Sequence, residues 1–255
     1  MLLLCVDVGN SSSVLGIFSA DRLVHSWRLH TAPAATSDEI AALLFQLCKL
    51  KECDPNSIQG LVVASVVPPL RVVWQEVGGV YLRCPTMIIG PDSKVGLTLD
   101  VEHPSEVGAD RIVDGLAAWR MYGAPIVVVD CGTAITVDAI GAGGAYRGGA
   151  IAPGIGIASE ALFQQAALLY RVELRQPDGA LGKTTAAQMR AGIMYGCAGQ
   201  IDHLVDRVRM EMGGADRVVA TGGFASLVIP LCKTVTVIDP WLTLHGLRLA
   251  YAALA

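Results

Sequence analysis

The chain has 255 residues, of which 53% are hydrophobic and only 16% charged, and its formal net charge is −4. This length is enough for two α/β domains of roughly 120 residues each. A slightly acidic chain without a Lys/Arg stripe lacks the footprint of a nucleic-acid-binding protein, so a small-molecule ligand is favoured and no nucleic-acid partner is expected.

The apolar content is high, but no run approaches the ~18 consecutive apolar residues of a membrane helix. The chain also enters its first apolar run without the basic segment of a signal peptide, so we expect a cytoplasmic protein that binds no membrane. Its seven cysteines form no Cys-x-x-Cys pair, which favours buried free thiols over disulfides or zinc sites. The apolar surplus predicts a buried interface between subunits.

The first half of the chain begins with strands. Apolar runs of strand length occupy residues 2–8, 14–18, 23–29 and 61–67. The first run ends at the turn-forming pair Gly9-Asn10, and the short polar connection between the second and third suits an antiparallel hairpin. Thr36-Ser37-Asp38-Glu39 has the spacing of a capping box, so a helix is expected to start there. Pro68-Pro69 is expected to stop the fourth strand.

The second half alternates helices and strands. Helical spacing is found at residues 108–122, 157–167, 185–212 and 242–254, and strand-length apolar runs at residues 126–129, 135–140, 145–152, 218–221 and 235–238. A strand, an acidic turn and two further apolar segments therefore occur once in each half. We predict a duplicated α/β unit, with domains at 1–115 and 116–255.

The two acidic turns are the most informative repeat. Val6-Asp7-Val8-Gly9-Asn10 and Val129-Asp130-Cys131-Gly132-Thr133 both place Asp, any residue and Gly after an apolar strand, at an offset of about half the chain. A carboxylate at such a strand end can orient hydrated Mg²⁺, and the glycine lets the backbone approach phosphates. One copy alone is typical of ordinary turns. The repetition predicts a clamp on a nucleotide's phosphates in a cleft between the halves.

Other residues in these segments add donors or a surface for the nucleotide base. Ser11 and Ser12 supply hydroxyl groups beside Asn10, and Thr133 supplies the matching group in the second turn. Gly222-Gly223 follows a strand. That pair either lets an adenine ring lie against the backbone or begins a helix, and the sequence favours neither.

Gly108-Ala109-Asp110-Arg111 opens a predicted helix. In one interpretation Asp110 is an ordinary acidic residue at a helix N-terminus, where the helix dipole favours negative charge. In the other, Asp110 is the general base that accepts the proton of an alcohol during phosphoryl transfer, and Arg111 binds an anionic group. Asp110 is the best-placed candidate for that base.

Taken together, the motifs and their order along the chain resemble those of the type III pantothenate kinases. These are members of the superfamily of acetate and sugar kinases, heat-shock ATPases and actin. The resemblance is carried by Asp7-Val8-Gly9-Asn10-Ser11, Thr36-Ser37-Asp38-Glu39, Ser65-Val66-Val67-Pro68, His103-Pro104, Gly108-Ala109-Asp110-Arg111, Asp130-Cys131-Gly132-Thr133-Ala134, Gly148-Gly149-Ala150-Ile151-Ala152-Pro153-Gly154, Gly182-Lys183-Thr184-Thr185, Thr221-Gly222-Gly223 and Leu242-Thr243-Leu244-His245-Gly246-Leu247. It implies two tandem ribonuclease-H-like domains with mixed sheets flanked by helices.

The resemblance also implies an activity, ATP-dependent phosphorylation of pantothenate at its primary hydroxyl, the first step toward coenzyme A. ATP would come with Mg²⁺, an activating K⁺ or NH₄⁺ would be required, and the enzyme would be a homodimer. Asp110 would be the catalytic base. ATP and its phosphates would be bound by Asp7 (which also holds Mg²⁺ through water), Gly9, Asn10, Ser11, Gly132, Thr133, Gly222 and Gly223.

By the same resemblance, pantothenate would be bound by Gly108, Ala109, Val101, Arg111 and Thr185, and Asp130 would take part in binding the monovalent cation. The sequence departs from the family in three places. Ser11 replaces the usual Thr, Val101 aligns with the usual Tyr of the substrate loop, and Leu169-Tyr170-Arg171 stands where the family prefers Leu-Pro-Arg. Two alternatives stay open, a non-catalytic regulatory relative with the same nucleotide-binding fold and a kinase of the superfamily that acts on another alcohol.

Overall fold

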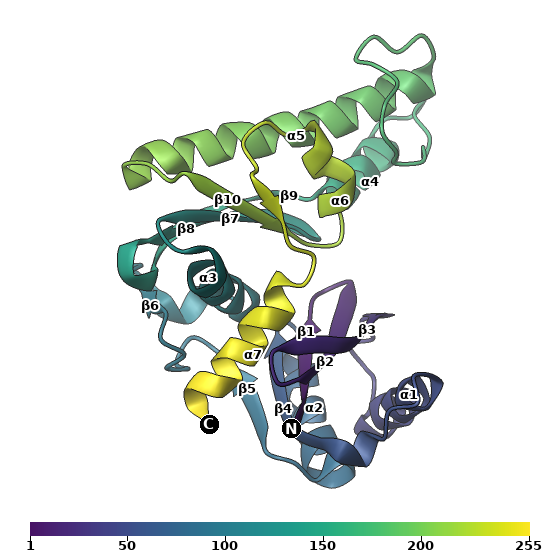
Figure 1. Ribbon diagram of the computed structural model, residues 1–255. Coiled ribbons are helices and arrows are strands. Elements are labelled where there is room, and N and C mark those ends of the chain that lie inside the picture. Colours follow the sequence, from purple (N-terminus) through teal and green to yellow (C-terminus); the bar gives the residue numbers. More distant parts are fainter. The chain divides into compact units, whose positions relative to one another are not determined.

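The computed structural model describes residues 1–255, which group into two compact units (Figure 1). Unit 1 comprises Met1–Ala117 and Leu242–Ala255, and unit 2 comprises Ala118–Trp241. No helix combines the length and the apolar content that crossing a bilayer requires. The seven cysteines are free thiols, and three of them, Cys5, Cys48 and Cys131, are buried.

Unit 1 contains a five-stranded mixed sheet. Its main elements are β1 (Leu2–Val8), β2 (Ser12–Ser19), β3 (Arg22–His30), α1 (Ser37–Leu50), β4 (Ile58–Ser65), α2 (Pro68–Glu76), a π-helix (Val77–Leu82), β5 (Thr86–Ile89), β6 (Thr98–Leu99), the start of α3 (Ala109–Tyr122) and α7 (Leu242–Leu254). The sheet order is β3-β2-β1-β4-β5. The strand β1 runs antiparallel to β2 and parallel to β4.

The central strand β1 is buried on both faces, which explains its unbroken apolar sequence. Leu4 and Val6 point into a core that also includes Leu44 of α1 and Trp74 of α2. The opposite face, which carries the fully buried Cys5, is covered by α7. Because alternate residues of a strand point to opposite faces, a strand between two helical layers needs apolar residues at nearly every position.

Unit 2 repeats the strand order and directions of unit 1. It contains β7 (Ile126–Cys131), β8 (Ala134–Gly141), β9 (Ala145–Pro153), α4 (Ile155–Gln165), α5 (Thr185–Met212), β10 (Arg217–Thr221), α6 (Ala225–Val228) and β11 (Val237–Ile238). Among the strands of unit 2, read from β9, the order is β9-β8-β7-β10-β11. As in unit 1, the first strand is antiparallel to the second and parallel to the fourth. The predicted α/β fold with two mixed sheets and flanking helices is confirmed.

Two local features differ from the sequence-based expectations. The strand β4 already ends at Ser65, and Pro68 and Pro69 are the first residues of α2. Proline is favoured at this position because its fixed φ suits the first helical turn, where its missing N–H has no partner to lose. The pair therefore begins a helix as well as following a strand.

The second difference concerns the C-terminal helix α7, which belongs to the first unit and not to the second. We expected residues 116–255 to form one domain, but α7 packs on β1, β2 and β4 and belongs to unit 1. The contact is close, because a Cβ atom at Gly246 would lie 2.0 Å from the carbonyl oxygen of Val113 in α3. Only glycine allows this approach between α7 and α3.

Candidate active site

The first acidic turn follows β1 in unit 1. Asp7 is half-buried and pairs with Val14 of β2 and Ala64 of β4, which fixes its place at the carboxyl end of the sheet's central strand. The N–H of Gly9 donates to the carbonyl of Ser12 at 3.1 Å and closes the turn. Asn10, at the tip, is exposed. This end of a sheet is where α/β folds bind their ligands.

A buried threonine holds this turn from behind. Thr31 is 2% exposed, and its hydroxyl donates to the carbonyl of Gly9 at 2.8 Å. Its Oγ1 lies 2.9 Å from Oγ of Ser13, and its N–H donates to the carbonyl of Ser11 at 3.2 Å. Two hydrogen bonds therefore fix the backbone that carries the predicted phosphate donors, and the third holds the Thr31 side chain itself. Sequence reasoning missed Thr31, which follows a strand without any motif around it.

The second acidic turn has matching geometry in unit 2. Asp130 sits at the penultimate position of β7, and the N–H of Gly132 donates to the carbonyl of Ala134 at 3.1 Å. Thr133 is exposed at the tip. In both units the chain that leaves the neighbouring parallel strand bonds to the end of the strand before the turn. After β4, the N–H of Val66 donates to the carbonyl of Val8 at 3.0 Å, and after β10, the N–H of Phe224 donates to the carbonyl of Cys131 at 2.9 Å.

The carboxylate of Asp130 lies in a cradle made by glycines. A Cβ atom at Gly222 would lie 2.2 Å from Oδ1 of Asp130 and 2.6 Å from the backbone of Cys131, and the φ of Gly222 is +97°. A Cβ atom at Gly132 would lie 3.2 Å from Oδ2 of the same carboxylate. The sequence analysis predicted that these glycines contact the nucleotide; what the structure shows is that they make room for Asp130. Gly223, the next residue, is exposed.

Burial keeps the thiol next to Asp130 neutral. Cys131 is buried, and this raises its pKa above the ordinary thiol range, with the charge of Asp130 adding to the effect. The Cys131 thiol is therefore not an anionic group of this turn.

The predicted base stands at the beginning of α3. Asp110 lies in the first turn of that helix and is half-buried, and its Oδ1 accepts a hydrogen bond from the N–H of Arg111 at 2.9 Å. A Cβ atom at Gly108 would lie 2.3 Å from the same oxygen. Gly108, Ala109, Asp110 and Arg111 are thus brought together at one helix N-terminus, where the peptide dipoles favour the ionised carboxylate.

Two residues predicted to bind pantothenate, Val101 and Thr185, take no part in the hydrogen bonds described above. Val101 is half-buried in a bend before a short 3₁₀ helix at Pro104–Glu106. Thr185 is the exposed first residue of α5, and the cap of that helix is Thr184, whose hydroxyl accepts from the N–H of Ala187 at 3.2 Å. The structure places both residues at the ends of loops, and neither is hydrogen-bonded to another predicted site residue.

The carboxylates suit a divalent ion that arrives with a nucleotide. No group of three or more His, Cys, Asp or Glu side chains forms a ready-made metal cage. Mg²⁺ in phosphoryl-transfer enzymes keeps several waters and is bound through one or two carboxylates plus the phosphates of its substrate. Asp7, a single carboxylate at the carboxyl end of β1 beside a glycine turn, fits that mode of binding.

Comparison with known proteins assigns the chain to a family. The family model described as type III pantothenate kinase matches residues 3–207. This chain belongs to the type III pantothenate kinase family. It is 50% identical over 250 residues to the type III pantothenate kinase of Moorella thermoacetica, 44% to that of Myxococcus xanthus and 42% to that of Geobacter sulfurreducens, covering 98% of this chain and 98% of each relative.

Solved structures agree with the fold of the family. A Campylobacter jejuni protein described as a conserved putative Baf family transcriptional activator matches with a TM-score of 0.62 at 19% identity, over 98% of this chain and 97% of that one. The activator of 2-hydroxyisocaproyl-CoA dehydratase from Clostridium difficile, solved with ADPNP, matches at 0.58 and 12% identity, over 100% of this chain and 94% of that one. At these identities the likeness establishes the two-domain fold. As a member of a kinase family, the protein uses ATP with a divalent metal.

Proposed function

We propose that this protein transfers the γ-phosphoryl group of ATP to the primary hydroxyl of pantothenate, giving 4′-phosphopantothenate. The observation that carries the proposal is the near full-length identity of 41–50% to type III pantothenate kinases. The two acidic turns of matching geometry support it, because a kinase must hold the phosphates of ATP with fixed donors.

In this proposal Asp110 is the general base. The hydroxyl oxygen of pantothenate forms a bond to the γ-phosphorus, the bond from that phosphorus to the β–γ bridging oxygen breaks, and ADP leaves. The hydroxyl proton passes to the carboxylate of Asp110 as the new bond forms. Asp110 lies in the first turn of α3 beside Gly108 and Arg111, the residues proposed to bind pantothenate. This supports the role, because a general base must lie within reach of the hydroxyl whose proton it accepts.

The neighbours of Asp110 are proposed to bind pantothenate. Arg111 would pair with the carboxylate of the substrate, an interaction that guanidinium geometry favours. Gly108 and Ala109 would border the same pocket, and Thr185 and Val101 would close it. Because Val101 replaces a usual Tyr, we expect that part of the pocket to make an apolar contact only.

The two turns are proposed to bind ATP. Asn10, Ser11 and Thr133 would donate to phosphate oxygens, with Gly9, Gly132, Gly222 and Gly223 allowing close approach of the backbone. Mg²⁺ bound with ATP would be held through water by Asp7 and would neutralise charge on the phosphates. Asp130 would take part in holding K⁺ or NH₄⁺. We also propose a cytoplasmic homodimer, which sedimentation of the purified protein would test.

The Asp110→Asn variant tests the base. It keeps the size of the side chain and removes the proton acceptor, so kcat should fall by several orders of magnitude while ATP and pantothenate still bind in calorimetry. Asp21→Asn, in the exposed turn between β2 and β3, is the matched control and should behave as the parent protein. Parent-like turnover by Asp110→Asn would exclude Asp110 as the base.

The substrate and the cation are tested in one assay. ADP release should require pantothenate together with K⁺ or NH₄⁺, and Na⁺ should not substitute. Release that depends on a sugar and ignores pantothenate would favour a kinase for another alcohol. Tight nucleotide binding without any turnover would favour a non-catalytic regulatory relative.

A further inference from the structure

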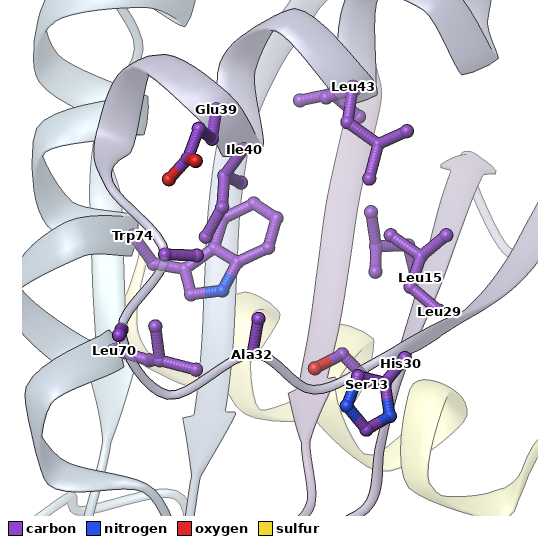
Figure 2. Close-up of a pocket in the computed structure, with 13 residues that line it drawn as sticks. Ser13, Leu15, Leu29, His30, Ala32, Glu39, Ile40, Leu43, Leu70 and Trp74 are labelled. Carbon is purple, nitrogen blue, oxygen red and sulfur yellow. The ribbon is translucent and has the colours of Figure 1, made fainter.

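Unit 1 contains a pocket that is separate from the residues predicted to bind ATP and pantothenate. Its volume is about 430 Å³, and it opens between the β2–β3 hairpin, the loop that follows β3, and the helices α1 and α2 (Figure 2). Volumes of a few hundred cubic ångströms are typical of small-molecule sites. None of the predicted ATP or pantothenate residues lines this pocket.

The walls are largely apolar. Leucine and isoleucine side chains from the hairpin and from both helices form them, including Leu15, Leu29, Ile40 and Leu70. On the loop side the wall consists of the small residues Ala32, Ala34 and Ala35, whose methyl groups leave the space unfilled. Removing apolar ligand surface from water is favourable by roughly 25 cal/mol per Å², so such walls select an apolar body.

A tryptophan contributes a polar group to this largely apolar lining. Trp74 of α2 lines the pocket and is 2% exposed, and its indole N–H makes no hydrogen bond within the protein. Figure 2 shows the edge that carries the nitrogen turned toward Ala32. An indole N–H is a hydrogen-bond donor only, so an acceptor that enters the pocket can satisfy it. The Trp74 side chain therefore offers one donor to a ligand that carries an acceptor.

The charges around the pocket select against anions. The titratable side chains that line it are Glu39 and the exposed His30, and no Lys or Arg does. The carboxylate of Glu39 already accepts hydrogen bonds from the N–H and the hydroxyl of Thr36 at 2.8 and 3.0 Å. A ligand carboxylate or phosphate would lose its hydration without gaining a Lys or Arg partner. A neutral acceptor such as a carbonyl oxygen loses much less.

We propose that this pocket is a binding site for a small neutral molecule with an apolar body and a single carbonyl-type acceptor, which the indole N–H of Trp74 recognises. The site adjoins the first phosphate turn. Ser13 lines the pocket, and its hydroxyl lies 2.9 Å from that of Thr31, which in turn donates to Gly9. An occupant would therefore touch the network that holds this turn.

The test uses three fluorinated probes of one shape, observed by ¹⁹F NMR with the full-length protein. 4-Fluoroacetophenone carries the acceptor, 1-ethyl-4-fluorobenzene lacks it, and 4-fluorobenzoate is the anion. We expect saturable binding of the first two and none of the benzoate. Trp74→Phe should weaken the ketone about five- to tenfold, the worth of one hydrogen bond, and leave the hydrocarbon unchanged.

A second variant locates the site. Ala32→Phe places a ring in the mouth of the pocket and should abolish binding of both neutral probes, with thermal melting as the check that the variant folds. If Ala32→Phe does not fold, Leu43→Trp, on the α1 side of the pocket, is used in its place. The proposal is overturned if the ketone still binds the Ala32→Phe variant, or if Trp74→Phe weakens the binding of both neutral probes equally. It is also overturned if binding of the ketone to the parent protein does not saturate up to about 10 mM.

Discussion

Replacing Gly222 with alanine tests the cradle around Asp130. The new methyl group would lie 2.2 Å from the carboxylate and 2.6 Å from the backbone of Cys131, at a φ of +97°. The backbone conformation alone costs a non-glycine residue about 1 kcal/mol or more. Relieving contacts with main-chain atoms, which cannot rotate away, adds about 1–3 kcal/mol. The sum is about 2–4 kcal/mol.

Gly123→Ala is the matched control. Gly123 belongs to the same unit and has a similar φ of +84°, but a Cβ atom there would meet nothing within 4 Å. It should therefore show the conformational cost alone, about 1 kcal/mol. In calorimetry this corresponds to a fall in Tm of about 2–4 °C for Gly123→Ala and about 5–15 °C for Gly222→Ala.

Activity separates the two variants further. Moving the Asp130 carboxylate should raise the concentration of K⁺ needed for half-maximal rate in Gly222→Ala, while Gly123→Ala keeps the parent requirement. Equal Tm values for both variants would refute the steric reasoning. A lower Tm for Gly222→Ala with an unchanged K⁺ requirement would refute the role of Asp130 in cation binding.

Three further outcomes are expected. Thr31→Val, which keeps the shape but loses the hydroxyl, should lower stability by about 1–3 kcal/mol and raise the KM for ATP, and Thr31→Ser should restore both. Hydrogen bonds from the backbone and side chain of Thr36 lower the pKa of Glu39 below its ordinary 4.5. The stability that this cap contributes is therefore present above pH 4.5 and lost as the pH falls through the lowered pKa. Glu39→Gln should weaken the dependence of Tm on pH in that range. Burial raises the pKa of Cys5 and of Cys131, so iodoacetamide should modify both only after unfolding.

The hydrophobic pattern predicted most elements of the fold because their causes are local. The span of α5, Thr185–Met212, and that of α7, Leu242–Leu254, were both predicted from helical spacing and confirmed. The capping box of Thr36 and Glu39 is formed as expected. The acidic repeat predicted that the two halves share one unit, and the matching strand orders show why two turns have the same geometry.

What the sequence could not predict depends on contacts between distant residues. The hydrogen bond from Thr31 to Gly9 joins residues 22 positions apart. Gly222 meets Asp130 because β10 pairs in parallel with β7, with Thr221 opposite Asp130. No local signal carries either contact. The pocket beside Trp74 likewise arises where small loop residues face a helix from another part of the chain.

The place of α7 bears on the order in which the two units can be completed on the ribosome. Unit 2 is one continuous segment, Ala118–Trp241, whereas unit 1 also needs Leu242–Ala255. Synthesis that begins at the N-terminus therefore finishes the segment of unit 2 first, although unit 1 was started earlier. Until α7 emerges, the apolar face of β1 that carries Cys5 lacks its cover, so a nascent chain halted before Leu242 should be a substrate for chaperones.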